Sequence, residues 1–396
     1  MELRNLLIGD KIQSNMGKES RVGIIGTGFI ARGLSYSLQS DESLGVSRIL
    51  TRRNYEEVRD MAVEKRQITN SIQELVDTSD IVVECSGDPI HATDALIKVL
   101  EAGIPVVTMD SELQVTTGSW LQKRGLLTEA EGDQPGSLAA LQKDVLGMGF
   151  EPIVYGNIKG FLNHTPTVDE MRYWGNRSGI SLDQVTSFTD GTKIQIEQTL
   201  VANGLGVNIV RRGMLGVECN DYRDGAIELA KKADSMGLRI SDYVLSPKSP
   251  AGVFIAAKHD REQSPFLRYY KLGDGPYYVL TRPFHLCHLE ITKTIRQVLQ
   301  GEGVLLNNGD NPQVSVATIA KRRLVPGELL KRGVGGFSVR GEALNISGNE
   351  THVPIGLVFD VVMKRYVEPG QIITFDDIEI PESKALVAWQ ETIRQR

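Results

Sequence analysis

The sequence predicts an α/β protein in three parts: a doubly wound parallel domain, a central mixed α/β domain and a small β-rich C-terminal module. Three observations support this prediction. Short β-branched runs alternate with helical segments over residues 18–156, a glycine-rich turn follows the first strand at 26–33, and a short pattern recurs near the C-terminus. Strands that alternate with helices imply right-handed crossovers and a mainly parallel sheet covered on both faces.

The first part, residues 18–156, is predicted to be a Rossmann-type domain that binds NAD(P). Its β-branched runs predict five strands, at 21–25, 46–50, 80–84, 105–109 and 152–155. The segments between these runs have the apolar spacing of amphipathic helices. The turn at 26–33 follows the first strand directly and opens a helix, which is the arrangement that starts a doubly wound domain.

The second part, residues 157–311, is predicted to be a catalytic and dimerisation domain of mixed α/β structure. Helices are expected at 168–174, 192–203 and 285–300, and strands at 184–188, 252–257 and 277–281. The helix at 285–300 could pack back on the first domain. Glycine and asparagine are frequent at 301–312, which indicates a linker and a boundary near Asn311.

The third part, residues 312–396, contains an internal repeat. KRRLVPGELL at 321–330 and KRYVEPGQII at 364–373 share the pattern K-R-x-apolar-x-P-G-x-apolar-apolar. Pro-Gly between apolar runs is typical of a type II turn, so the repeat predicts a β-rich module with pseudo-twofold pairing. The pattern resembles the SAF domain, the antifreeze-like module appended to sialic acid synthases and some sugar-acid enzymes.

Composition excludes several classes of protein. The 50 acidic and 44 basic residues give a net charge of −6, so no strong basic field is available for nucleic acid or anionic membranes. No apolar run approaches the roughly 18 residues of a membrane span, and the first twenty residues lack the features of a signal peptide. Cys85, Cys219 and Cys287 have no CxxC spacing. We therefore expect a cytoplasmic protein with reduced thiols.

A dinucleotide site is predicted at the first turn, where the sequence reads G-x-G-x-x-A-x-G. Gly26 permits the turn, Gly28 lets the backbone approach a pyrophosphate, and the following helix presents unpaired N–H groups. The second strand ends in two arginines and lacks the acid typical of NAD sites, which favours NADP(H) over NAD(H). The expected cofactor-binding residues are Gly26, Gly28, Phe29, Ile30, Thr51, Arg52, Arg53, Cys85, Ser86 and Gly87.

Four polar segments follow the cofactor site. EGDQPG at 131–136 places two carboxylates beside a helix start, and Lys159 follows the strand at 152–155. Lys193 and Glu197 are four residues apart and so share a helix face, either as a surface ion pair or as a donor to a substrate oxygen and the group that fixes it. Arg282 and His285 lie at a strand-to-helix corner.

These segments, in this order and followed by the C-terminal module, resemble the homoserine dehydrogenase-like oxidoreductases that carry a SAF domain. Within that group the chain resembles the 1-deoxy-D-xylulose 5-phosphate reductoisomerase-like enzymes of isoprenoid biosynthesis. The resemblance implies that Lys193, Glu197 and Asp190 are catalytic. It also implies that Lys159, Arg282 and His285 line the substrate pocket. Asn157 stands where relatives often have a basic residue, which leaves the substrate open.

The expected activity is NADPH-dependent oxidoreduction of a small, anionic, polyhydroxylated substrate, with the reductoisomerase reaction as the first choice. Lys193 would stabilise the negative charge that develops on a carbonyl oxygen. A reductoisomerase commonly also uses Mg²⁺ or Mn²⁺, for which Glu131, Asp190 and Glu197 are the candidate ligands. The alternatives are a dehydrogenase or oxidoisomerase of a sugar acid or homoserine-like hydroxy acid, and a non-catalytic nicotinamide-binding protein. A homodimer or higher homo-oligomer is expected, without nucleic-acid or membrane partners.

Overall fold

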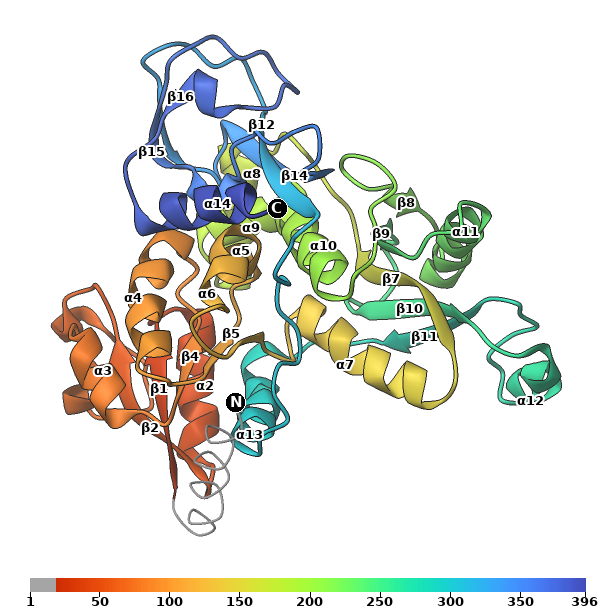
Figure 1. Cartoon of the computed structure of the whole chain (residues 1–396), viewed down its shortest axis with the longest axis horizontal. Coiled ribbons are helices and arrows are strands. Elements are labelled where there is room, and N and C mark those ends of the chain that lie inside the picture. The colour runs from red at the N-terminus through yellow and green to blue at the C-terminus, as the bar shows by residue number, and fades with distance from the viewer. Residues whose placement is uncertain (1–18) are drawn as a thin grey trace.

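The structure, a computed structural model, describes residues 19–396. The first eighteen residues, which include nearly all of the segment that argues against a signal peptide, lie outside this range. No helix within 19–396 combines the length and the apolar character needed to cross a bilayer. The chain forms two large sheets, each covered by helices, and a C-terminal module that sits above both (Figure 1).

The N-terminal sheet has six parallel strands in the order β3-β2-β1-β4-β5-β6. The strands are β1 (Ser20–Ile25), β2 (Leu44–Leu50), β3 (Ile68–Thr69), β4 (Ile81–Glu84), β5 (Val106–Thr108) and β6 (Leu127–Glu129). The strand order reverses between β1 and β4, and ligands of doubly wound sheets bind outside the carboxyl ends of strands at such a point. This arrangement confirms the predicted fold class.

Helices from distant parts of the chain cover both faces of this sheet. Those within the first domain are α2 (Phe29–Gln39), α3 (Ile72–Thr78), α4 (Pro89–Glu101), α5 (Ser111–Leu113) and α6 (Ser119–Leu121). On one face, Leu34 of α2 shares a hydrophobic cluster with Ile295 of α13 (Ile291–Leu299). On the other face, Leu96 of α4 shares a cluster with Ala388 of α14 (Lys384–Arg394). Both later segments of the chain are therefore anchored on the first domain.

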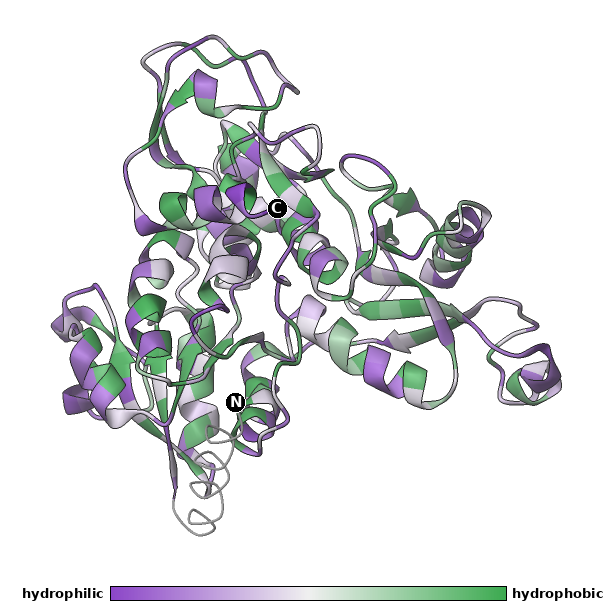
Figure 2. Ribbon diagram, in the orientation of Figure 1, coloured by the Kyte–Doolittle hydropathy of each residue, from purple (hydrophilic) through white to green (hydrophobic). Residues whose placement is uncertain are grey.

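The central sheet has five strands in the order β11-β10-β7-β9-β8, in which β10 runs antiparallel to β7 and β11. The strands are β7 (Glu151–Lys159), β8 (Val217–Glu218), β9 (Ile240–Leu245), β10 (Val253–Lys258) and β11 (Tyr278–Arg282). The helices are α7 (Gln134–Gly147), α8 (Val168–Ser178), α9 (Leu182–Thr189), α10 (Thr192–Gly204), α11 (Tyr222–Ser235) and α12 (Ser264–Tyr269). Apolar residues of α7 and α10 pack on one face of this sheet and those of α11 on the other. The strands of both large sheets are mainly hydrophobic, as this double covering requires (Figure 2).

The C-terminal module contains two small antiparallel sheets, β12-β14 and β13-β15-β16. The strands are β12 (Val314–Ala320), β13 (Leu329–Arg332), β14 (Val339–Asn345), β15 (Phe359–Met363) and β16 (Ile378–Glu379). The two repeats face each other, since Leu324 and Val367 exchange backbone hydrogen bonds of 2.9 and 3.2 Å. Gly327 and Gly370 have φ of +83° and +81°, as the Pro-Gly turns require.

Several sequence-based predictions of single elements are wrong. The run at 184–188 is part of helix α9, because Ser181 and Gln184 form a capping box that starts a helix there. The strand predicted at 152–155 belongs to β7, in the centre of the second sheet, and the sixth strand of the first sheet is the short β6 instead. The helix predicted from 285 begins only at Ile291, after a single turn at 287–289.

Candidate active site and cofactor site

The turn between β1 and α2 has the backbone shape of a dinucleotide site. Gly26 has a φ of +115°, and a Cβ there would lie 2.9 Å from the backbone oxygen of Cys85. At Gly28 an added Cβ would meet nothing within 4 Å, so the space in front of the helix is open. No side chain caps α2 and no acidic residue stands in its first turn. The free N–H groups and the helix dipole there suit a pyrophosphate.

A cavity of about 370 Å³ lies at this turn. It is lined by Ile25, Gly26, Thr27, Gly28, Leu50, Thr51, Arg52, Arg53, Ser86 and His91. Six of the predicted cofactor residues thus face one cavity: Gly26, Gly28, Thr51, Arg52, Arg53 and Ser86. Phe29, Ile30, Cys85 and Gly87 belong to the adjoining segments but do not line it. The residues present therefore fit a nicotinamide dinucleotide.

The two arginines after β2 differ in their surroundings. Arg52 Nη2 lies 2.5 Å from Asp88 Oδ2, at the start of α4. The side chain of Arg53 forms no ion pair within residues 19–396. Arg53 is therefore the guanidinium that is free for a phosphate.

Lys193, in the first turn of α10, forms the centre of the candidate active site. Its Nζ donates to Ser111 Oγ at 2.9 Å and to Asp133 Oδ2 at 3.2 Å, and it lies 3.6 Å from Glu197 Oε1. Burial would lower the pKa of Lys193, but the carboxylates of Asp133, Glu197 and Glu129 outweigh it and raise that pKa. Lys193 is therefore a protonated ammonium in a site from which water is largely excluded.

Glu197 is almost fully buried, and other predicted residues converge on it. It accepts from Asn157 Nδ2 at 2.9 Å, and both Lys159 and His285 lie close enough to lower its pKa. Burial is the stronger effect and raises the pKa of Glu197. The fold thus brings together four residues that the sequence singled out: Lys159, Lys193, Glu197 and His285.

Gln134 links this group to His285. In the orientation that satisfies both ends of its amide, the nitrogen donates to Asp133 Oδ1 at 2.7 Å and to Glu197 Oε1 at 3.2 Å. The other end of the amide then faces His285 Nε2 at 3.3 Å. Gln134 therefore fixes both carboxylates that flank the lysine and connects them to the imidazole.

Arg282 is committed to carboxylates, contrary to the expectation that it binds substrate. Its Nη1 lies 2.7 Å from Glu131 Oε1, and its Nη2 pairs with Glu290. Lys293 Nζ joins the same two carboxylates at 2.9 and 3.2 Å. This network ties the EGDQPG segment to the start of α13.

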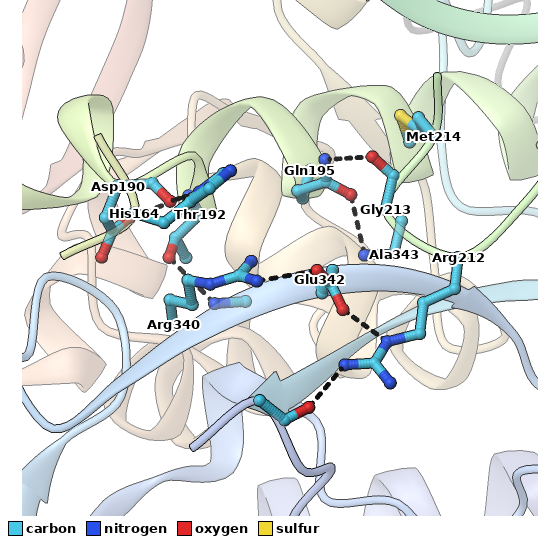
Figure 3. Close-up of polar contacts among 12 residues, drawn as sticks. His164, Asp190, Thr192, Gln195, Arg212, Gly213, Met214, Arg340, Glu342 and Ala343 are labelled. Carbon is cyan, nitrogen blue, oxygen red and sulfur yellow. Dashed lines mark hydrogen bonds and ion pairs between the residues drawn. The ribbon is translucent and has the colours of Figure 1, made fainter. Parts of the chain in front are cut away.

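Asp190 also has a structural partner. Its Oδ2 lies 2.5 Å from Lys321 Nζ of the C-terminal module, and both side chains are buried. Figure 3 shows Asp190 beside His164 and Thr192 at the start of α10, where Thr192 Oγ1 accepts from the Gly341 amide of β14 at 2.9 Å. Asp190 therefore joins α10 to the C-terminal module, and the catalytic role predicted for it is not supported by its contacts.

The contacts of α10 with the C-terminal module continue along the helix (Figure 3). Gln195 donates to the carbonyl of Gly213 and accepts from the amide of Ala343, both at 2.9 Å. Glu342 pairs with Arg340 at 2.8 Å and also with Arg212. The bonds of Gln195 tie the helix that carries Lys193 to β14 and to the loop at Gly213.

The three residues proposed as metal ligands are not brought together as ligands. Glu131 is paired with Arg282 and Lys293, Asp190 with Lys321, and Glu197 with Lys193. Within residues 19–396 no group of three His, Cys, Asp or Glu side chains is arranged to hold a metal ion. The carboxylates that could ligate a cation are neutralised by lysine or arginine instead, so these residues do not fit the metal.

Sequence reasoning missed Ser111 and singled out Asp133 only as part of EGDQPG. Ser111 lies three residues after the end of β5, so an available signal was the acidic segment MDSE (109–112) at the carboxyl end of that strand. Glu84 is fully buried nearby and Glu112 is partly buried, and burial raises the pKa of each to about 8.

Two family models match the chain. Residues 26–124 match the NAD-binding domain of homoserine dehydrogenase, and residues 132–291 match the catalytic domain of oxidoreductase DRL. Lys159, Lys193, Glu197, Arg282 and His285 all lie within the second match, and neither match extends into the C-terminal module. These matches confirm the prediction of an NAD(P)-dependent oxidoreductase with a homoserine dehydrogenase-like cofactor domain.

The comparison with solved structures gives matches at low identity. A hyperthermophilic archaeal homoserine dehydrogenase in complex with NADPH is 14% identical, with a TM-score of 0.43 over 71% of this chain and 97% of that one. The UDP-N-acetylglucosamine 3-dehydrogenase GnnA from Acidithiobacillus ferrooxidans is 13% identical, with a TM-score of 0.43 over 74% and 92%. A myo-inositol dehydrogenase from Corynebacterium glutamicum is 12% identical, with a TM-score of 0.43 over 72% and 90%. No curated protein matches the chain in sequence.

Proposed function

We propose that this NAD(P)-dependent oxidoreductase uses NADPH to reduce a carbonyl group of a small, anionic, polyhydroxylated substrate, with Lys193 as the donor to the carbonyl oxygen. The observation that carries the proposal is that the Lys193 ammonium has one N–H group without a hydrogen-bond acceptor within residues 19–396. Two of its N–H groups are used by Ser111 and Asp133, whereas Glu197 Oε1, at 3.6 Å, is beyond hydrogen-bond distance. The third N–H is therefore available to a substrate oxygen.

NADPH would be held by the turn at 26–28 and by the residues after β2 and β4, and when bound it supplies the hydride. The open space at Gly28 and the uncapped start of α2 would receive the pyrophosphate. Arg53 would pair with the 2′-phosphate, since its guanidinium is not engaged by an acid of residues 19–396.

Lys193 would first stabilise the negative charge on the carbonyl oxygen of the substrate and then donate a proton to that oxygen. As hydride arrives, negative charge develops on the carbonyl oxygen, and a preorganised ammonium in a dry site stabilises that charge strongly. The raised pKa of Lys193 keeps the ammonium charged before the reaction. Asp133 and Ser111 hold its Nζ in place, and Glu197 balances its charge.

The surroundings of Lys159 support the proposal that the substrate is anionic. The Nζ of Lys159 lies 5.8 Å from the centre of the Phe188 ring, and the side chain forms no ion pair within residues 19–396. Its ammonium lies close enough to Glu197 to lower the pKa of that carboxyl. A phosphate or a carboxylate of the substrate would both satisfy this cation.

The resemblance noted in the sequence directs the first substrate test to 1-deoxy-D-xylulose 5-phosphate. Reduction and rearrangement to 2-C-methyl-D-erythritol 4-phosphate would place the chain in isoprenoid precursor synthesis. The second candidate is a dehydrogenase or oxidoisomerase of a sugar acid or homoserine-like hydroxy acid. The second candidate is favoured by one observation: Glu131, Asp190 and Glu197 are paired with cations, and simple hydride transfer needs no carboxylate-held metal.

The two candidates are separated by one set of assays on the purified protein. Oxidation of NADPH by 1-deoxy-D-xylulose 5-phosphate with Mg²⁺ or Mn²⁺ is followed at the nicotinamide absorbance, in parallel with reduction of NADP⁺ by a tetronate, a branched pentonate or homoserine. Turnover with the first substrate supports the reductoisomerase. Turnover only in the second arm overturns it in favour of the dehydrogenase, and no turnover in either arm counts against the proposed substrate class.

We further propose that the C-terminal module is SAF-like and begins near residue 311, and that the enzyme is a cytoplasmic homodimer or higher homo-oligomer. The reciprocal pairing of the two Pro-Gly repeats supports the first point. The first domain ends before α7 and not near residue 156, because β7 belongs to the central sheet and α7 packs on it. Light scattering after size-exclusion chromatography tests the oligomeric state, and a monomeric mass would contradict it.

A further inference from the structure

A second cavity, of about 510 Å³, adjoins the cofactor cavity. The two share Leu50, Thr51, Arg52, Arg53 and His91. The other lining residues of the second cavity are Asn54, Asn70, Ile72, Asp94, Ala95, Lys98 and Lys384. Eleven of its lining residues come from the first domain, whereas Lys384 comes from the far end of the chain.

The lining of this second cavity is strongly cationic. Arg52, Arg53, Lys98 and Lys384 face it, with Asp94 as its one acidic residue. Lys384 Nζ lies 3.8 Å from Asp94 Oδ1, which is an ion pair without a hydrogen bond. Lys98 forms no ion pair within the described residues. The cavity therefore has more positive charge than its own acid balances.

Lys384 is placed at the cavity by the packing of α14. Ser383 caps this helix by accepting from the Leu386 amide at 3.1 Å. Ala388 packs with residues of α4, and Trp120 Nε1 donates to Glu391 Oε2 at 2.6 Å. In Figure 1, α14 accordingly lies against the end of α4 at the top of the first domain. The packing of α14 thus fixes the backbone position of Lys384, whose side chain is 55% exposed.

A second contact joins the C-terminal module to the cofactor loop. Arg332 Nη2 donates to the backbone oxygen of Gly87 at 2.9 Å, and its Nη1 pairs with Asp183 at 3.3 Å. Gly87 lies between Ser86, which lines the cofactor cavity, and Asp88, which holds Arg52. The C-terminal module therefore contacts the loop beside the cofactor cavity and also lines the adjoining second cavity.

We propose that the second cavity binds the adenosine 2′-phosphate end of NADPH, and that the C-terminal module contributes to cofactor specificity through Lys384. This inference rests on the proposed use of NADPH. The cavity adjoins the site proposed for the pyrophosphate and shares lining residues with it, so the adenosine can extend into it. A 2′-phosphate carries about two negative charges, which Arg53, Lys98 and Lys384 can balance, whereas the ribose of NADH offers them only a hydroxyl.

The test measures binding of 2′,5′-ADP and of 5′-ADP by calorimetry, using the full chain and the Lys384→Glu and Lys98→Glu variants. Each variant should bind 2′,5′-ADP about tenfold more weakly, equivalent to ~1.4 kcal/mol, with little change for 5′-ADP. A glutamate in the first turn of α14 suits the helix dipole, so we expect Lys384→Glu to fold. Lys384→Gln, which removes the charge without reversing it, should give a smaller loss.

Arg394→Glu is the matched control. It reverses the same charge on the same helix, ten residues and about 15 Å further along, and Arg394 does not line the cavity. It should bind both nucleotides as the unmodified chain does. Equal losses for both nucleotides in Lys384→Glu, or no loss, would overturn the inference.

The outcome for the unmodified chain separates this inference from the proposed function. If the chain binds 2′,5′-ADP no tighter than 5′-ADP, the proposed preference for NADPH is itself wrong, and the inference falls with it. If the chain prefers 2′,5′-ADP and Lys384→Glu keeps that preference, only the role of the C-terminal module is overturned.

Discussion

Replacing Lys193 by alanine is the sharpest test of the proposed chemistry. The change removes the only ammonium that contacts both Asp133 and Glu197 within the described residues. Loss of one preorganised donor to a developing oxyanion typically lowers kcat by about 10² to 10³, and we expect a loss of that size here. NADPH should bind with nearly unchanged affinity, because Lys193 does not line the cofactor cavity.

The same change should also affect stability, and in a pH-dependent way. Asp133 and Glu197 are buried, and leaving buried charges unpaired costs ~3–5 kcal/mol. Without the ammonium, the already raised pKa of Glu197 should rise further, so its carboxyl takes up a proton and the cost decreases at low pH. A folded-state pKa above the unfolded value means that the variant loses stability as pH rises towards the folded pKa.

The assay is steady-state turnover together with NADPH titration by fluorescence and urea unfolding at several pH values. Lys143→Ala, at an exposed lysine of α7, serves as the matched control and should behave as the unmodified enzyme. Unchanged kcat in Lys193→Ala would refute the reasoning and leave the residue as a structural ion pair. A parallel loss of NADPH binding would show that the variant acts through the fold.

Three further outcomes are expected. Arg53→Glu should lower NADPH affinity by about one to two orders of magnitude and leave NADH affinity unchanged, measured by fluorescence titration; tighter binding of NADH by the unmodified chain would contradict this. Lys321→Ala should lower the free energy of unfolding by ~3–5 kcal/mol because Asp190 is left buried and unpaired, and Lys321→Met with Asp190→Asn should recover most of that loss in urea titrations. Burial raises the pKa of Glu84 to about 8, so the unmodified chain should lose stability as pH rises from about 4.5 to about 8, whereas Glu84→Gln should lose less. Thermal unfolding at several pH values measures this, and the same change of Tm with pH in both proteins would contradict the assignment.

The fold could be predicted where local sequence and tertiary structure agree. The turn at 26–28 follows a buried β-branched strand and opens a helix, and the structure has that arrangement. Prediction failed at β6, whose three residues include the polar Thr128 and Glu129, so no apolar run marks it. It also failed at α9, where Val185 and Thr186 suggest a strand but Ser181 caps a helix. In both cases an apolar pattern was a poor guide: β6 is short and polar, and at α9 the capping box of Ser181 and Gln184 starts a helix.

The candidate site was predictable where its residues lie on one element. The spacing of Lys193 and Glu197 places them on one face of α10, and the structure pairs them. Ser111 and Asp133 are 82 and 60 residues away from Lys193 along the chain, so no spacing rule connects them. For Arg282 the sequence predicted a substrate contact that the structure does not favour. Its position between a strand and a helix does not reveal that Glu131 and Glu290 pair with it.

The position of Lys193 depends on how the first and central domains are docked, because its partners come from both. Ser111 follows β5 of the first sheet, whereas Glu197 lies on α10. The segment before α13 fits tightly into this junction: a Cβ on Gly33 of α2 would come within 2.5 Å of the His288 ring, and one on Gly132 within 2.6 Å of the Cys287 oxygen. A larger side chain at either glycine would push the domains apart and move Ser111 away from the ammonium. Such changes should therefore reduce turnover more than they reduce cofactor binding, since the cavity at 26–28 lies wholly within the first domain.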